Sequence, residues 1–151
     1  MKARDKLQSH KKKKKKTDRQ RAINQADREA SIFVRTRDSI DGIKGKCPFC
    51  GKVELIKYMD CGHFISRTRM GTRFDERNMN LQCKGCNLRQ SKGLDGIEYR
   101  HGLEIDKKWG EGTAEELINI SKQIKKLSVI EIEEIAENYR IKLNENKKKR
   151  D

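Results

Sequence analysis

The stretches Cys47-Pro48-Phe49-Cys50 and Cys83-Lys84-Gly85-Cys86 decide the fold of this chain, because each places two thiols on one tight turn. Together the two turns can present Cys47, Cys50, Cys83 and Cys86 to a single tetrahedral ion. We therefore predict a closed four-cysteine zinc site, in which the metal-binding energy becomes folding energy. The fifth cysteine, Cys61, is expected to be a free or buried thiol rather than a ligand.

The composition of the chain suggests that the fold needs such a metal site for stability. The chain has 151 residues, of which 33% are hydrophobic and 5% aromatic, and this is a lean supply for a large core. No apolar run approaches the ~18 residues of a membrane-spanning helix, and the first residues carry charge without an apolar signal segment. We expect a cytoplasmic protein without membrane contact, whose cysteines bind metal or stay free instead of forming disulfides.

The charge of the chain points to polyanionic partners. Lys and Arg number 37 against 23 Asp and Glu, which gives a net charge of +14. Such a surplus favours DNA or RNA as a partner. Most of it lies in residues 1–20, which we predict to be a disordered basic tail, with a shorter basic tail at 147–151. The long tail is either a solubilising segment or an arm that grips phosphates without selectivity.

Apolar periodicity predicts helices on both sides of the cysteine-rich centre. The first runs from about residue 21 to 37. Three later starts are marked by capping patterns: Asp95 with Glu98, Thr113 with Glu116, and Ser128 with Glu131. The last two helices should have roughly 14 and 17 residues, and their Ile and Leu stripes indicate either core or a homodimer seam. His101, in the middle of the helix before them, is expected at the surface.

The segment between the two cysteine pairs is too long for a simple zinc ribbon. Its 32 residues exceed the roughly 15 to 20 of that motif, so another element is inserted. Residues 53–58 are β-prone, and His63 follows between glycine and apolar residues. Asn78 stands five residues before the second cysteine pair, and Asn87 directly follows that pair.

This order of a histidine, an asparagine before a Cys-x-x-Cys pair and an asparagine after it resembles the HNH, or His-Me finger, endonucleases. More narrowly, the chain resembles the NinG (Rap) recombination proteins of lambdoid and related phages. Four stretches carry this resemblance: CGHFISR at 61–67, TRFDERN at 72–78, QCKGCN at 82–87 and DKKWGEGTAEEL at 106–117. It covers about residues 30–120 and leaves the tails and the last helix uncovered.

The resemblance implies an α+β fold with a ββα-metal finger of the treble-clef or HNH type, braced by zinc and flanked by helices. Residues 21–112 would form the nuclease domain with its leading helix, and residues 113–146 a helical extension. The implied activity is metal-dependent, structure-selective cleavage of DNA at branched recombination intermediates such as Holliday or Y junctions. It would take place in the cytoplasm of the bacterial host.

The resemblance also assigns roles to single residues. His63 would be the general base that activates water, Asn78 would orient the finger loop and the base, and Asn87 would hold the catalytic Mg²⁺ or Mn²⁺. These roles suit the chemistry, because a neutral imidazole can take a proton at cellular pH and a hard cation prefers oxygen ligands. The alternatives are a structural histidine at 63 and a turn-forming asparagine at 78.

The residue before the predicted base departs from the wider HNH pattern. An acidic residue or a histidine commonly stands there and binds the metal, whereas this chain has Gly62. A second cation ligand must therefore come from elsewhere, and we predict Asp75, in the TRFDERN motif, ahead of Asp60. The alternative for Asp75 is a carboxylate that caps a turn or pairs with an arginine.

Basic side chains cluster around the predicted site, which favours phosphate contact over a merely solvated face. The predicted DNA-binding residues, with Arg67 and Arg73 as first choices, are Arg67, Arg69, Arg73, Arg77, Lys84 and Arg89. Two other functions stay open. One is a zinc-stabilised nucleic-acid-binding module without catalysis, and the other is a structural protein that dimerises through residues 113–146.

Overall fold

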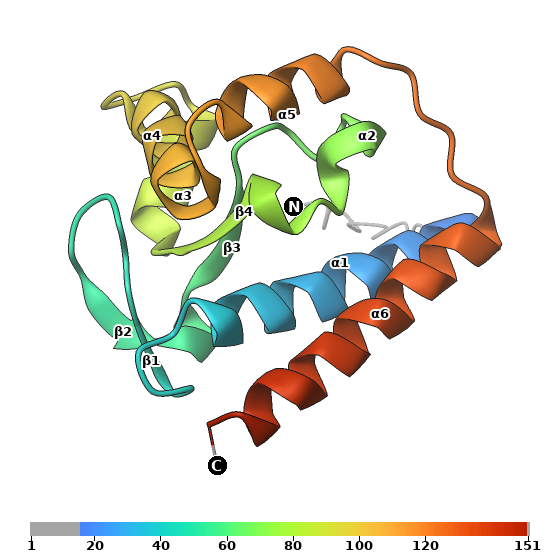
Figure 1. Cartoon of the computed structure of the whole chain (residues 1–151), viewed down its shortest axis with the longest axis horizontal. Coiled ribbons are helices and arrows are strands. Elements are labelled where there is room, and N and C mark those ends of the chain that lie inside the picture. Colours follow the sequence, from blue (N-terminus) through green and yellow to red (C-terminus); the bar gives the residue numbers. More distant parts are fainter. Residues whose placement is uncertain (1–15, 151) are drawn as a thin grey trace, which may run out of the picture.

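The computed structural model describes residues 16–150 as a mixed α+β fold, in which six α-helices accompany two small antiparallel sheets (Figure 1). In chain order the elements are α1 (Asp18–Arg37), β1 (Lys44–Lys46), β2 (Val53–Leu55), the 3₁₀ turn η1 (Ile56–Tyr58), β3 (Asp60–His63), α2 (Met70–Arg73), the 3₁₀ turn η2 (Glu76–Asn78), β4 (Met79–Gln82), α3 (Lys84–Ser91), α4 (Ile97–Trp109), α5 (Thr113–Ser121) and α6 (Val129–Lys148). The predicted α+β class is confirmed.

Each sheet consists of two antiparallel strands. β1 pairs with β2, and the first cysteine pair lies in the connection between them. β3 pairs with β4 in a register that sets Asp60 opposite Gln82 and His63 opposite Met79, while α2 and η2 occupy the long loop between these strands. β4 leads directly into α3. The centre of the chain therefore has the order strand, long loop, strand, helix.

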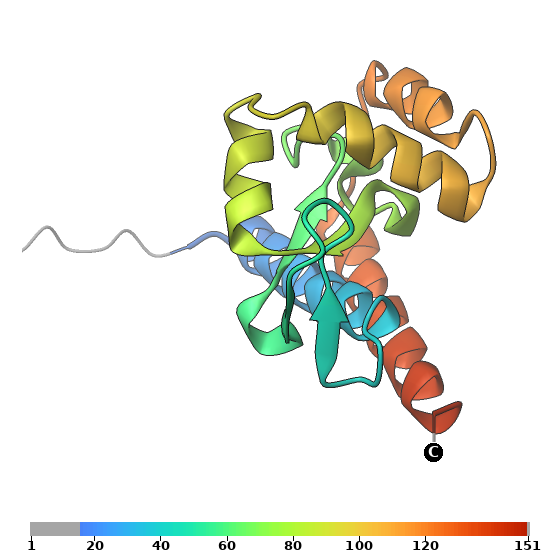
Figure 2. The same ribbon diagram turned by 90° about the vertical axis from the view of Figure 1, so that its left-hand side faces the viewer.

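The helices α1 and α6 lie side by side and run in the same direction, although the whole centre separates them in sequence (Figure 1, Figure 2). At one end Arg19 donates to the Leu127 carbonyl, and at the other end Arg150 donates to the Thr36 carbonyl over 2.9 Å. The apolar stripe of α6 is buried in clusters shared with α1 and consists of Ile132, Ala136, Tyr139 and Leu143. Of the two alternatives predicted for this stripe, core or homodimer seam, these residues belong to the core.

The interior is divided into several apolar clusters, as the lean composition suggests. One of them holds Cys47, Cys83 and Cys86 together with Leu81 of β4 and Ile97 of α4. The cysteine turns are thus part of the core rather than an appendage to it. Within residues 16–150, no helix has the length and apolar character needed to cross a membrane.

Two predicted boundaries near the ends of the chain are wrong. α1 begins at Asp18, so residues 18–20 are helical instead of belonging to the disordered tail. α6 continues to Lys148, so the basic segment predicted as a tail at 147–151 starts as helix. The remainder of the predicted N-terminal tail, residues 1–15, lies outside the described residues.

The predicted helix starts are confirmed in one case and shifted in two. The Ser128 capping box at the start of α6 is present. The capping box at Thr113 is wrong, because α5 is capped by Gly112 at a φ of 88° and the Thr113 hydroxyl donates to a carbonyl of the preceding turn. α4 begins at Ile97 rather than at Asp95.

Candidate functional site

The four paired cysteines converge on one point, as predicted. The Sγ atoms of Cys47, Cys50, Cys83 and Cys86 all lie within 4.8 Å of one another, and those of Cys50 and Cys83 are 3.6 Å apart. Four bonds of about 2.3 Å to a tetrahedral zinc ion would separate the sulfur atoms by about 3.8 Å. The cluster could therefore hold a metal ion such as zinc.

Local backbone geometry explains why these thiols meet. Gly51 has a φ of 75°, which closes the tight turn after Cys50, and Cys83 caps α3 by accepting from the Cys86 N–H. The backbone N–H of Lys52 lowers the pKa of Cys50 to about 7. A thiol with that pKa is readily deprotonated, and the thiolate is the form that binds metal. Cys61 is buried outside the cluster, as expected of a free thiol.

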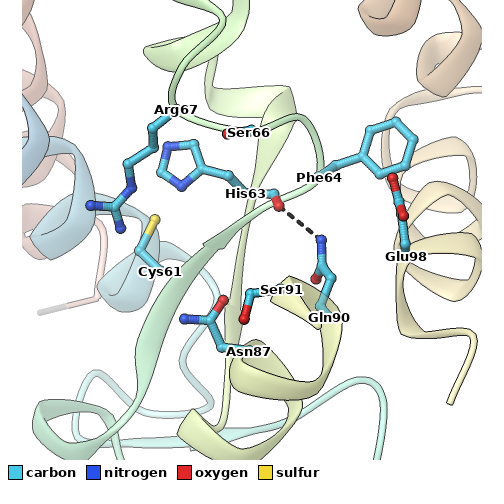
Figure 3. Close-up of a pocket in the computed structure, with 9 residues that line it drawn as sticks. All are labelled: Cys61, His63, Phe64, Ser66, Arg67, Asn87, Gln90, Ser91 and Glu98. Atoms are coloured by element: carbon cyan, nitrogen blue, oxygen red, sulfur yellow. Dashed lines mark hydrogen bonds between the residues drawn. The ribbon is translucent and has the colours of Figure 1, made fainter. Parts of the chain in front are cut away.

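A pocket of about 340 Å³ opens beside β3 and brings together residues from three predicted roles (Figure 3). His63 reaches it from the end of β3, Arg67 from the loop that follows, and Asn87 from α3 on the other side of the strand. The remaining lining residues are Cys61, Phe64, Ser66, Gln90, Ser91 and Glu98. The predicted base and the predicted cation ligand thus share one pocket.

The imidazole of His63 is held in a defined tautomer. Its Nε2 atom lies 3.1 Å from the Arg73 carbonyl, and because a carbonyl can only accept, Nε2 carries the proton. The other nitrogen, Nδ1, is buried and has no hydrogen-bond partner in the described part of the chain. Burial, helped by the charge of Arg67, lowers the pKa of His63 to about 4. At neutral pH the ring is uncharged, with its free lone pair on Nδ1.

Asn78 holds the loop that follows His63. It is fully buried, its Oδ1 accepts from the Ile65 N–H over 2.7 Å, and its Nδ2 donates to the carbonyls of Ile65 and Thr72, each over 3.0 Å. These bonds span the loop between β3 and β4 and differ from the local bonds of an asparagine turn. The loop-orienting position predicted for Asn78 is therefore observed, and its part in catalysis stays a prediction.

Asn87 is fixed at both ends of its carboxamide. Its Nδ2 donates to the Asp60 carboxylate over 2.9 Å, and its Oδ1 accepts from Gln82 Nε2 over 2.8 Å. The carboxylate next to Asn87 is thus that of Asp60, which was the second choice, after Asp75, for the additional cation ligand. Gln82 begins the QCKGCN motif, but the sequence analysis gave it no role, because its contact with Asn87 depends on how β4 and α3 pack.

Asp75 does not lie in the His63 pocket, and the preference for it as a cation ligand is not supported by its contacts. Its carboxylate accepts from the backbone N–H of Arg77 over 3.0 Å and pairs with the guanidinium of the same residue at 2.8 Å. Asp75 therefore matches the alternative prediction, a carboxylate that caps a turn or pairs with an arginine.

The predicted phosphate-binding residues divide into free and engaged side chains. Arg67, Arg69, Lys84 and Arg89 are exposed, and among the described residues the one carboxylate near Arg89 is that of Asp95, at a long 3.5 Å. Two others are engaged within the fold. Arg73 makes two bonds to the Asp27 carboxylate, of 2.6 and 3.1 Å, and Arg77 is paired with Asp75 and Glu116. This ion pair makes Arg73 a weaker candidate for phosphate contact than Arg67, and its DNA-binding role stays a prediction.

The prediction that His101 lies at the surface is wrong. This side chain is 0% exposed and lies between the rings of Phe49 and Phe64. Its Nδ1 is 3.0 Å from Gln90 Oε1, and Gln90 Nε2 donates to the His63 carbonyl over 2.8 Å. A signal existed in the sequence, because His101 stands four residues from both Ile97 and Ile105 on one helix stripe.

Comparison with known families agrees with the motifs quoted above. The family model described as Bacteriophage Lambda NinG protein matches residues 1–149. The chain belongs to the NinG family.

Individual NinG relatives are more distant than the family match suggests. The chain is 31% identical to the protein ninG of Escherichia phage 933W over 96 residues, which is 63% of this chain and 43% of the relative. It is 34% identical to that of Salmonella phage P22 over 79 residues, or 52% of this chain and 36% of the relative. The chain thus covers less than half of the curated relatives it matches. No solved structure matches it.

Proposed function

We propose that this NinG protein is a metal-dependent endonuclease that hydrolyses DNA phosphodiester bonds at branched recombination intermediates, such as Holliday or Y junctions, during phage recombination. The observation that carries the proposal is the pocket beside β3. There His63, an uncharged histidine whose buried Nδ1 has no hydrogen-bond partner among residues 16–150, lines the same space as Asn87 and the exposed residue Arg67.

The chain order around the pocket supports an HNH-like ββα-metal finger. His63 ends β3, the long loop and β4 follow, and α3 then carries Asn87 directly after the ligand Cys86. Zinc in the cysteine cluster would fix the start of α3 and with it the position of Asn87.

The residues next to Asn87 fit a hard divalent cation. Its side-chain oxygen lies at the pocket, and the Asp60 carboxylate beside it adds negative charge. Mg²⁺ or Mn²⁺ prefers such oxygen donors and is held through few protein ligands, with water and phosphate oxygens completing its coordination. When bound, the cation would stabilise the negative charge that develops on the phosphate and the leaving oxygen. Asp60 does not itself line the pocket, but its carboxylate contacts Asn87, and for that reason we propose it here in place of Asp75.

His63 would accept the proton of the attacking water on Nδ1. The Arg73 carbonyl keeps the proton on Nε2, and Gln90 holds the His63 backbone, so the ring is oriented before substrate arrives. The low pKa of His63 keeps this nitrogen unprotonated throughout the physiological range. Arg67, which has no carboxylate partner among the described residues, would contact a phosphate at the same pocket.

Cleavage of defined DNAs tests the proposal. Purified zinc-loaded protein is incubated with Holliday, Y-shaped and linear duplexes in Mg²⁺, Mn²⁺ or EDTA. We expect cation-dependent cutting that favours the branched DNAs. His63→Ala should lower the rate by about 10²- to 10⁴-fold while junction affinity changes only a few-fold. Binding without cutting under every condition would favour the non-catalytic zinc module, and light scattering would show whether a homodimer forms.

Zinc content and melting temperature provide the control for this variant. Both should match the wild-type values, because His63 is not in the cysteine cluster. A folded, zinc-loaded His63→Ala protein that cuts at the normal rate would remove His63 from the mechanism.

A further inference from the structure

A buried glutamine lies directly behind the pocket. Gln82, the last residue of β4, is 0% exposed. Its Nε2 donates to Asn87 Oδ1 over 2.8 Å and lies 3.5 Å from Gln90 Oε1. Its own oxygen, Oε1, is buried and has no hydrogen-bond partner among residues 16–150. A buried acceptor without a partner is rare enough in proteins to require a physical reason.

Gly62 provides the space that this side chain occupies. A Cβ atom at position 62 would lie 2.2 Å from Gln82 Cδ and 2.4 and 2.5 Å from its amide nitrogen and oxygen. Gly62 does not have a positive φ, so its backbone conformation does not demand glycine. The glycine is needed because the carboxamide of Gln82 rests on its Cα.

The orientation of both amides follows from a single carboxylate. Asp60 can only accept, so the amino group of Asn87 must face it. The oxygen of Asn87 then faces Gln82, and Gln82 must turn its own amino group toward that oxygen. Turning Gln82 over would set two oxygen atoms against each other. The amide of Gln82 is therefore turned so that its amino group donates to Asn87. As a result, its own oxygen, Oε1, is left without a partner among residues 16–150.

We propose that Gln82 is a positioning residue of the cation site, which holds the oxygen rather than the amino group of Asn87 toward the bound Mg²⁺ or Mn²⁺. This inference rests on the proposed function. A carbonyl oxygen has two lone pairs, so Oδ1 of Asn87 can accept from Gln82 and still face the pocket, where Figure 3 shows it. Without Gln82, the Asn87 oxygen loses the donor that fixes its position.

Manganese binding tests the proposal independently of cleavage. The full zinc-loaded chain is titrated with Mn²⁺ without DNA, and free Mn²⁺ is followed by electron paramagnetic resonance. Gln82→Met keeps the unbranched shape but removes the donor, and we expect the Kd for Mn²⁺ to rise about 10- to 100-fold, as for other residues that orient metal ligands. Thr113→Val is the matched control, because it removes one side-chain hydrogen bond of a buried residue away from the pocket and should leave the Kd unchanged.

A double-mutant cycle tests the link to Gly62. Gly62→Ala should weaken Mn²⁺ binding in the wild-type background, because the new methyl group displaces the Gln82 carboxamide. In a Gln82→Ala background the same substitution should add little, because the space is already empty. An equal effect of Gly62→Ala in both backgrounds would show that the glycine serves another purpose, and the proposed contact would be wrong.

The outcomes separate this inference from the proposed function. Wild-type protein that binds Mn²⁺ and cuts DNA, together with a Gln82→Met protein of unchanged Kd, overturns the positioning role alone. Wild-type protein that neither binds Mn²⁺ nor cuts DNA overturns both. Should Gln82→Met fail to fold, as judged by zinc content and circular dichroism, the Gly62→Ala variant gives the same decision, because its Kd must rise if Gln82 positions Asn87.

Discussion

Burial of His101 makes stability depend on pH in a way that one substitution can isolate. Its side chain is 0% exposed, and burial lowers its pKa to about 3. In the unfolded chain the pKa returns to about 6.5. Between about pH 6.5 and 3, His101 is therefore protonated in the unfolded state but not in the folded state. The folded state loses stability as the pH falls through this range.

The size of the loss follows from the two pKa values. At pH 7.5 almost no His101 is protonated in either state, whereas at pH 5.5 the unfolded form is about nine-tenths protonated and the folded form is not. The difference in unfolding free energy contributed by this residue is about 1.4 kcal/mol. Because the group is fully buried, solvent screening does not reduce this figure by much.

Urea unfolding of the wild type and of His101→Gln, at pH 7.5 and 5.5, measures this contribution. The glutamine side chain has no titrating group in this pH range. The variant also loses the contacts of the imidazole ring, but this loss of stability is the same at both pH values and cancels when the two pH values are compared for each protein. We expect the wild type to lose about 1.4 kcal/mol more than the variant between the two pH values. The contribution of His63 is present in both proteins and cancels as well.

Equal pH dependence of the two proteins would contradict this prediction. It would mean that His101 is protonated in the folded state, so its burial between Phe49 and Phe64 would be wrong. Imidazole resonances from NMR give a second measurement that does not require the variant to fold. The wild-type His101 signal should remain that of a neutral ring at pH 5.

Three further predictions concern single side chains. Cys47→Ser should abolish tight zinc binding and unfold the centre of the chain, as measured by elemental analysis and circular dichroism, because this residue is a buried member of the cysteine cluster. Arg67→Ala should weaken junction binding without changing the melting temperature, whereas Arg73→Ala should lower the melting temperature, because it leaves the half-buried Asp27 unpaired. Asp60→Asn should raise the Kd for Mn²⁺, whereas Asp75→Asn should leave it unchanged and cost stability.

The parts of the site that could be predicted from the sequence depend on short spacings. A Cys-x-x-Cys turn places its thiols together whatever the rest of the chain does, so the four-sulfur cluster follows from two local patterns. The same holds for Ser128, whose capping box is completed three residues later. His63 and Asn87 were found because each stands next to a recognisable motif, not because the sequence revealed their proximity.

What the sequence could not reveal depends on contacts between distant residues. The sequence around Arg73 suggests a phosphate ligand, because it does not show that Arg73 pairs with Asp27, which lies 46 residues away. Asp75 belongs to the TRFDERN motif and Asp60 does not, but strand pairing sets Asp60 opposite Gln82, and its carboxylate contacts Asn87. No local pattern encodes such pairings, because they arise only when β3, β4 and α3 have assembled.

The geometry makes the proposed chemistry depend on the cysteine cluster even though no cysteine of the cluster lines the pocket. Cys83 caps α3 and Cys86 lies in its first turn, so the position of that helix is fixed from its metal-binding end. Asn87 and Gln90 project from the next turn, where they meet Gln82 and the backbone of His63. Apolar packing around α3 is sparse, since only Cys86 of that helix is buried. Metal in the cluster would therefore stabilise α3 more than its own apolar contacts do, and the orientation of Asn87 would be lost with the metal before the α1 and α6 pair separated.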